Sequence, residues 1–92
     1  MPRVTVRIPP ALRPFTEGLS ELEAEGDTLR GLLEGLDQRH AGLRPRMLTP
    51  EGELRPFVNV FLDSDNARQL HGLDTPLREG GVVHILPAVA GG

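Results

Sequence analysis

Hydrophobic and polar residues alternate near the start of the chain, as they do in a strand with one buried face. Val4, Val6 and Ile8 are separated by single polar residues, and Pro9 then ends the run. The segment Glu21–Glu25 alternates just as strictly and is flanked by glycines. Glutamate, leucine and alanine also favour helix, but the alternation indicates a second strand whose acidic side chains face outward.

A longer period predicts one helix. Its four leucines fall at positions i, i+3, i+4 and i+7 and therefore share one face: Leu29, Leu32, Leu33 and Leu36. Either Asp27 or Thr28 can cap the start of this helix, and Gly42 is expected just past its end. We expect the leucine face to pack against the sheet.

The second half of the chain predicts further strands separated by irregular segments. Residues 43–56 contain several prolines and glycines, so we expect a connection with at most a short helical turn. The runs 57–62 and 82–86 are rich in β-branched or aromatic residues and predict strands. Between them, residues 63–66 predict a turn, and residues 72–77 predict either a short edge strand or a turn.

The order of these elements predicts one α+β domain over residues 1–92, in which a sheet packs on one main helix. The net charge of −3, with acids and arginines interleaved, argues against a nucleic-acid-binding protein. No apolar run approaches the length of a membrane span, and the chain begins directly with a strand pattern rather than an apolar leader. We therefore expect a cytoplasmic protein that binds neither nucleic acid nor membrane.

The sequence contains no cysteine, and all ten of its basic residues other than histidine are arginine. Without cysteine there is no disulfide, thiolate nucleophile or thiolate metal site. A protein whose carboxylate becomes an acylating group would gain from lacking amines and thiols. Genomic base composition is the simpler explanation for the missing lysine, and the sequence does not decide between the two.

No group of residues shows the spacing of a catalytic or metal site. His40, His71 and His84 have no close ligand spacing. Glu23 and Glu25 would lie on an exposed strand, without the burial that tunes a general acid. The chain also lacks a phosphate-binding loop. We expect it to hold no metal ion and no cofactor, and to catalyse no reaction by itself.

The C-terminus is the candidate site. Two glycines follow the predicted strand 82–86, and glycine lets a backbone enter a narrow channel. Chance is the alternative, because glycine is common here (11 of 92 residues). The reactive group would be the α-carboxylate of Gly92. The segment expected to enter a partner's channel, and to be flexible in the free protein, consists of Pro87, Ala88, Val89, Ala90, Gly91 and Gly92.

Several landmarks together resemble the MoaD/ThiS family of ubiquitin-like sulfur carriers. They run through the whole chain: Val4-Thr5-Val6, Arg13-Pro14, Gly26-Asp27-Thr28-Leu29, Phe57-Val58-Asn59-Val60 and Ile85-Leu86-Pro87-Ala88-Val89-Ala90-Gly91-Gly92. Within the family, the Arg-Pro pair, Phe-Val-Asn and the final eight residues most closely resemble the actinobacterial carriers that serve cysteine synthesis. The resemblance implies the β-grasp fold, with a mixed sheet on one main helix.

The resemblance also implies a carrier that acts as a co-substrate rather than an enzyme. A partner would use ATP to adenylate the Gly92 carboxylate, and a sulfur nucleophile would convert it to a thiocarboxylate. The implied partners are an E1-like adenylyltransferase, a rhodanese-type sulfurtransferase, a PLP-dependent cysteine synthase with O-phosphoserine as the acceptor substrate, and a metalloprotease. ATP, PLP and zinc would belong to these partners.

Alternation along the last strands predicts where a partner would dock. If their neighbours point into the core, Phe61, His84 and Leu86 face outward beside the tail. An exposed apolar cluster is typical of a docking surface. Alternatively, the connection formed by residues 43–56 covers Phe61.

Other functions are compatible with the same fold. The chain could be the small subunit of molybdopterin synthase, or the sulfur donor for a thiosugar or thiazole pathway. A ubiquitin-like modifier joined to lysines of target proteins belongs to a different class, and a plain interaction module would need no tail chemistry. The sequence leaves these alternatives, the acceptor enzyme and the oligomeric state open.

Overall fold

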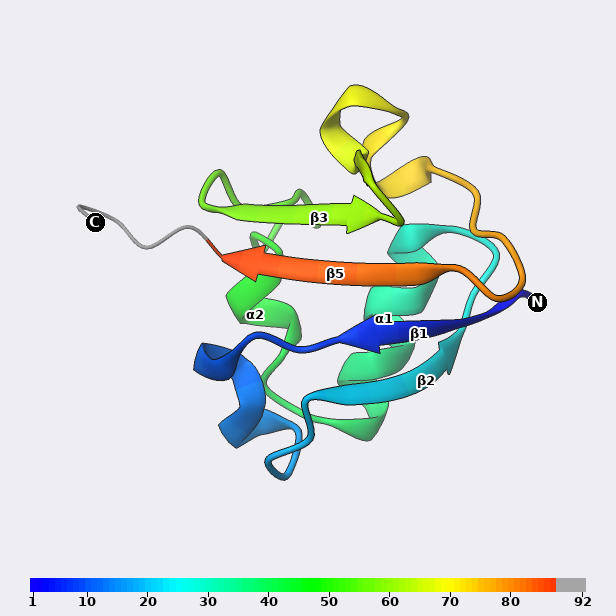
Figure 1. Ribbon diagram of the computed structural model, residues 1–92. Coiled ribbons are helices and arrows are strands. Elements are labelled where there is room, and N and C mark those ends of the chain that lie inside the picture. Colours follow the sequence, from blue (N-terminus) through cyan, green and yellow to red (C-terminus); the bar gives the residue numbers. More distant parts are fainter. Residues whose placement is uncertain (88–92) are drawn as a thin grey trace.

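The fold is built on one mixed sheet, seen in a computed structural model that describes residues 1–87 (Figure 1). The strand order is β2-β1-β5-β3-β4. The strands are β1 (Arg3–Arg7), β2 (Glu21–Glu25), β3 (Val58–Leu62), β4 (Asp65–Asn66) and β5 (Val82–Pro87). β1 pairs antiparallel with β2 and parallel with β5, whereas β3 is antiparallel to both β5 and β4. The predicted strands are therefore present, and the last one lies in the middle of the sheet.

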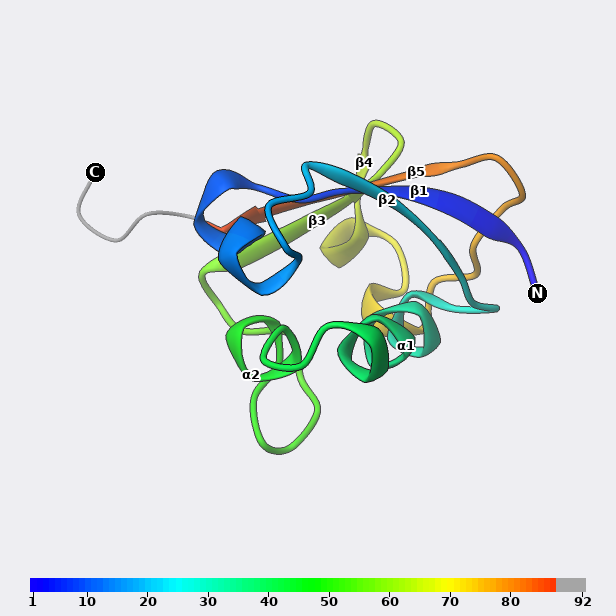
Figure 2. The same ribbon diagram turned by 90° about the horizontal axis from the view of Figure 1, so that it is seen from below.

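One main helix packs on a single face of this sheet, as predicted. Figure 2 shows α1 (Leu29–Arg39) and the short α2 (Arg44–Met47) on the same side. The four leucines of the predicted stripe are all 0% exposed. They pack with the inward residues of β1, β3 and β5 in one hydrophobic core. The amphipathic pattern of α1 is thus satisfied by burial of its leucine face in this core, to which α2 and η3 (Gly72–Asp74) also contribute.

The start and end of α1 follow from local chemistry. Of the two predicted caps, Thr28 is the one used, because its Oγ1 accepts a hydrogen bond from the backbone N–H of Gly31 at 3.3 Å. The helix ends at Arg39, and the N–H of His40 donates to the carbonyl of Leu36 at 2.7 Å. Gly42 follows with a φ of +102°, a conformation that glycine adopts without strain.

Residues between the strands form short helical turns rather than open loops. Residues 1–87 contain three 3-10 helices: η1 (Pro10–Phe15), η2 (Ala67–Gln69) and η3 (Gly72–Asp74). Of these, η1 is not predicted by the sequence pattern. Of the two alternatives predicted for residues 72–77, a short edge strand or a turn, the turn is the one formed. η3 is followed only by an isolated bridge between Thr28 and Pro76.

Two other expectations for the connecting segments are met. The connection 43–56 contains the single short helix α2, and the predicted turn after β3 is present. That turn is tighter than expected, because Asp65 and Asn66 already pair back with β3. No helix within residues 1–87 is long and apolar enough to cross a membrane.

Candidate functional site

The candidate site begins where β5 ends, at Pro87. Pro87 is half-buried and pairs with Val58 at the start of β3. Because proline fixes φ and donates no hydrogen bond, it stiffens the end of the strand. The other predicted tail residues, Ala88, Val89, Ala90, Gly91 and Gly92, lie outside the described residues.

The three residues of the predicted docking patch lie together on the sheet face opposite α1. In the β3–β5 pair, Phe61 is directly across from His84, and Leu86 is across from Asn59. Side chains of directly opposed residues on one face of a sheet are in contact distance of each other. Leu86 is 50% exposed, whereas Phe61 and His84 are half-buried. The patch thus runs along β5 toward its end at Pro87.

The connection 43–56 does not occupy this face. Figure 2 shows α2 and the loop after it on the same side of the sheet as α1. Alternation places Phe61 on the other side, since its neighbour Val60 is fully buried in the core. No helix from residues 1–87 packs on the outward face (Figure 2).

Phe57 is a further exposed apolar residue, and the sequence pattern does not predict its exposure. The run 57–62 predicts a strand that begins at Phe57, but β3 starts at Val58 and Phe57 is 61% exposed. The guanidinium of Arg68 fixes this segment, because its Nη2 donates to the carbonyls of Arg55 at 2.6 Å and Val58 at 2.7 Å. Phe57 is therefore held at the end of the sheet where β5 also ends. In the sequence, only the position of Phe57 directly after Pro56 indicates that this residue lies outside the strand.

The outward face changes character from one edge to the other. On β1 and β2, Arg7 lies 3.5 Å from Glu21, and Arg3 lies 4.0 Å from Glu25. All four of these side chains are more than half exposed, so the pairs contribute little to stability. On β5 and β3 the same face carries the docking patch predicted from the sequence, in which the apolar side chains of Phe61 and Leu86 accompany His84. A partner that binds this face would meet apolar surface beside β5 and charge beside β2.

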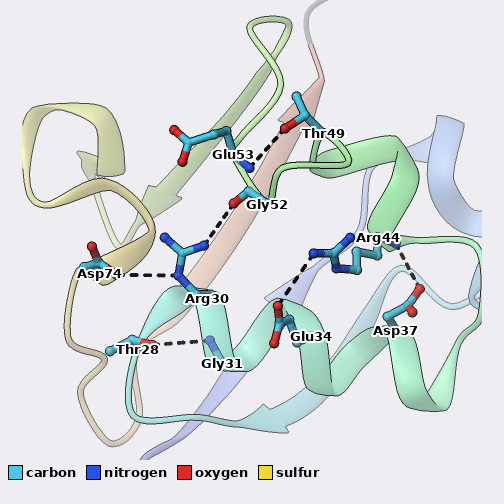
Figure 3. A network of polar contacts seen from close by, with 10 residues as sticks. All are labelled: Thr28, Arg30, Gly31, Glu34, Asp37, Arg44, Thr49, Gly52, Glu53 and Asp74. Carbon is cyan, nitrogen blue, oxygen red and sulfur yellow. Dashed lines mark hydrogen bonds and ion pairs between the residues drawn. The ribbon is translucent and has the colours of Figure 1, made fainter.

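A polar network lies on the helix side and joins α1 to its surroundings (Figure 3). Arg30 donates from Nη1 to the carbonyl of Gly52 at 2.9 Å, and its Nε lies 3.5 Å from Asp74. Arg44 pairs with Glu34 at 3.8 Å. These contacts hold the connection 43–56 and η3 against α1. The role of these side chains is structural, because each of them already binds another part of the chain.

The titratable side chains of the described residues are dispersed over the fold. Within residues 1–87, no three His, Asp or Glu side chains are grouped so that they could hold a metal ion. The histidines lie on different elements: His40 caps α1, His71 precedes η3 and His84 is in β5. Every buried polar side-chain atom of residues 1–87 has a hydrogen-bond partner. The site features that the structure describes are the outward face with Phe61, His84 and Leu86 and the end of β5 at Pro87.

Known proteins match this chain along nearly its whole length. The chain matches the ThiS family over residues 6–92. It is 42% identical over 91 residues to the sulfur carrier protein CysO of Mycobacterium tuberculosis, covering 97% of this chain and 98% of that protein.

Solved structures agree with the sequence comparison. A chain in the crystal structure of the Amycolatopsis orientalis BexX/CysO complex matches with a TM-score of 0.91 at 39% identity, covering 97% of this chain and 99% of that one. The small archaeal modifier protein 1 from Methanosarcina acetivorans matches with a TM-score of 0.87 at 28% identity, covering 100% and 98%. The ubiquitin-like β-grasp fold predicted from the sequence is confirmed.

Proposed function

Because this chain belongs to the ThiS family and is a sulfur carrier of the CysO type, we propose that Gly92 carries the sulfur as a thiocarboxylate. The observation that supports this most is the family match, which extends through Gly92. The similarity to CysO also runs along nearly the whole of both chains, so it is not confined to the fold's core.

The chemistry requires an activated carboxylate. An oxygen of the Gly92 carboxylate attacks the α-phosphate of ATP, pyrophosphate leaves, and an acyl adenylate forms. A hydrosulfide ion then attacks the carbonyl carbon, AMP leaves with the bonding electron pair, and one proton is released. The product is a thiocarboxylate, in which one oxygen of the chain has been replaced by sulfur.

Other proteins carry out these steps. We propose an E1-like adenylyltransferase for activation and a rhodanese-type sulfurtransferase as the sulfur source, whose persulfide is reduced by a thiol to release the hydrosulfide. A PLP-dependent cysteine synthase would receive the sulfur, which displaces the phosphate of O-phosphoserine and leaves a cysteinyl adduct on the carrier. A metalloprotease would then release cysteine. ATP, PLP and zinc are used by these enzymes, all of them in the cytoplasm, and none is bound by the carrier itself.

The patch of Phe61, His84 and Leu86 is the proposed docking surface for these partners. Its position supports the proposal, because it lies on the outward face and follows β5 to Pro87. A partner that takes residues 88–92 into a channel must also cover the end of β5. Ala88 and Ala90 have short side chains and Gly91 and Gly92 have none, which suits a narrow channel.

Intact-mass measurement tests the proposal. The protein is incubated with ATP, sulfide and extract of its own host, in parallel with a variant that lacks Gly92. We expect one oxygen to be replaced by sulfur in the C-terminal fragment of the full chain, and no change in the shortened variant. Addition of O-phosphoserine should then give the cysteinyl adduct. An unchanged mass in an extract that still hydrolyses ATP would contradict the proposal.

The similarity to a small archaeal modifier protein supports a second candidate function. A modifier would form an isopeptide bond between Gly92 and a lysine of a target protein. Because this chain contains no lysine, copies of it cannot be linked to one another through lysine side chains. Conjugates of higher mass that survive reducing agent would favour this function over sulfur transfer.

A further inference from the structure

A groove beside the end of β5 contains only apolar and basic side chains. It lies between the end of β1, the start of η1 and the last residues of β5. Its apolar walls include Pro9, Pro10 and Leu86. Its charged or titratable side chains are Arg7, Arg13 and His84.

Arg13 is held in place at this groove. It is half-buried, and its Nε donates to the carbonyl of Ile8 at 3.1 Å. Among residues 1–87, no carboxylate forms an ion pair with Arg13. A guanidinium fixed through one nitrogen has already lost much of its rotamer freedom, so a carboxylate that binds its other nitrogens meets a smaller entropic cost.

Arg7, which also lines the groove, has only a weak internal partner. Its Nε lies 3.5 Å from Glu21, and both side chains are more than half exposed. A pair of this kind exchanges readily with solvent or with another carboxylate. The groove therefore presents two positive charges beside an apolar surface.

The charge of the groove contrasts with that of the whole chain. The protein has 13 acidic residues and a net charge of −3, yet none of the acids lines this groove. We propose that the groove binds a segment of the tail-adenylating partner in which an acidic side chain lies next to an apolar one. The carboxylate binds Arg13, with Arg7 beside it, and the apolar side chain packs against Pro9, Pro10 and Leu86. The inference rests on the proposed function, because the partner is the enzyme that activates Gly92.

Charge reversal at Arg13 tests this inference, with Arg39 as the matched control. Both arginines donate one side-chain hydrogen bond to a backbone carbonyl, Arg13 to Ile8 and Arg39 to Glu23 at 2.8 Å. Arg39 lies at the β2 edge and does not line the groove. The initial rate of sulfur incorporation at Gly92 is measured with ATP, sulfide and host extract at several salt concentrations.

We expect Arg13→Glu to lower the rate by about ten-fold or more, the loss typical of one charge-assisted contact. Its rate should also depend less on salt than that of the unchanged protein, because an attractive charge pair has been removed. Arg39→Glu should stay within about two-fold, since surface substitutions usually have small effects.

A third variant separates recognition from structure. Arg13→Lys loses the Nε hydrogen bond to Ile8 but keeps the positive charge. Because the charge is what binds the partner's carboxylate, this variant should retain most of the rate. A Lys variant as slow as the Glu variant would assign Arg13 a structural role and overturn the inference. Equal rates for the unchanged protein and Arg13→Glu would overturn this inference and leave the proposed function standing. Failure of the unchanged protein to gain sulfur would overturn the proposed function, and this inference with it.

Discussion

The two faces of β5 differ sharply in burial, although their residues alternate along one strand. Ile85 is 1% exposed and packs in the core, whereas its neighbour Leu86 is 50% exposed on the outward face. Both are aliphatic and of the same size. Stability should therefore depend on the inward residues and partner binding on the outward ones. Because alternation separates the two sets, each can be changed without the other.

Substitution of these two neighbours should give the largest difference. Ile85→Ala leaves a cavity in a closely packed core and should lower the free energy of unfolding by about 2–5 kcal/mol. Leu86→Ala removes a side chain that is half in water, and should cost about 1 kcal/mol or less. Urea unfolding followed by far-ultraviolet circular dichroism measures both. Equal losses would mean that the outward face is covered.

Two glycines extend the same contrast to the α1 side of the fold. A Cβ atom added at Gly26 would lie 2.7 Å from the backbone nitrogen of Leu32, so Gly26→Ala should destabilise the protein by about 1–3 kcal/mol. A Cβ atom added at Gly35 meets nothing within 4 Å, and Gly35→Ala should stabilise the helix by about 0.5–1 kcal/mol. Thermal unfolding of both variants should show shifts of opposite sign. If both substitutions stabilised the protein, the close packing of Gly26 against Leu32 of α1 would be contradicted.

Removal of the exposed leucine side chain should affect function more than stability. Leu86→Ser is expected to slow sulfur incorporation by about ten-fold, since a central apolar contact in an interface contributes on the order of 1–2 kcal/mol. Leu19→Ser is the matched control, because Leu19 is also exposed but lies outside the patch and the groove. Intact mass over time gives both rates. If the two variants load equally fast, the outward face of β5 is not the docking surface.

The smallest predicted effect concerns the start of α1. Thr28→Ala removes the oxygen that accepts from the N–H of Gly31, and should cost about 1 kcal/mol. Thr28→Ser keeps that oxygen and should unfold at nearly the same urea concentration as the unchanged protein. Neither substitution is near β5, so sulfur incorporation should be unaffected by both.

Much of the fold followed from periodicity. The leucine stripe predicts α1, and strict alternation predicts β1 and β2, because buried faces impose a regular spacing on the sequence. β3 and β5 follow instead from their richness in β-branched or aromatic residues. The sequence does not predict η1, since prolines indicate the end of a strand more clearly than the start of a 3-10 helix. β4 is only two residues long and lies within the predicted turn.

The site was predictable to a different extent. The alternation of side chains along the two strands β3 and β5 was enough to place Phe61, His84 and Leu86 on one face. The exposure of Phe57 and the groove at Arg13 could not be seen in the sequence. They depend on where a strand begins and on contacts between β1, η1 and β5, which are distant in the chain.

The most direct test of the account is the chemical state of Gly92 in protein isolated from its own host. The extract is treated with iodoacetamide and digested with trypsin, and the fragment after Arg78, residues 79–92, is weighed. Because the chain has no cysteine, a thiocarboxylate at Gly92 is the strongest nucleophile available for alkylation in this fragment. We predict an S-alkylated thiocarboxylate, absent from a variant lacking Gly92. A fragment found only as the free carboxylate, or joined to a lysine of another protein, would contradict the account.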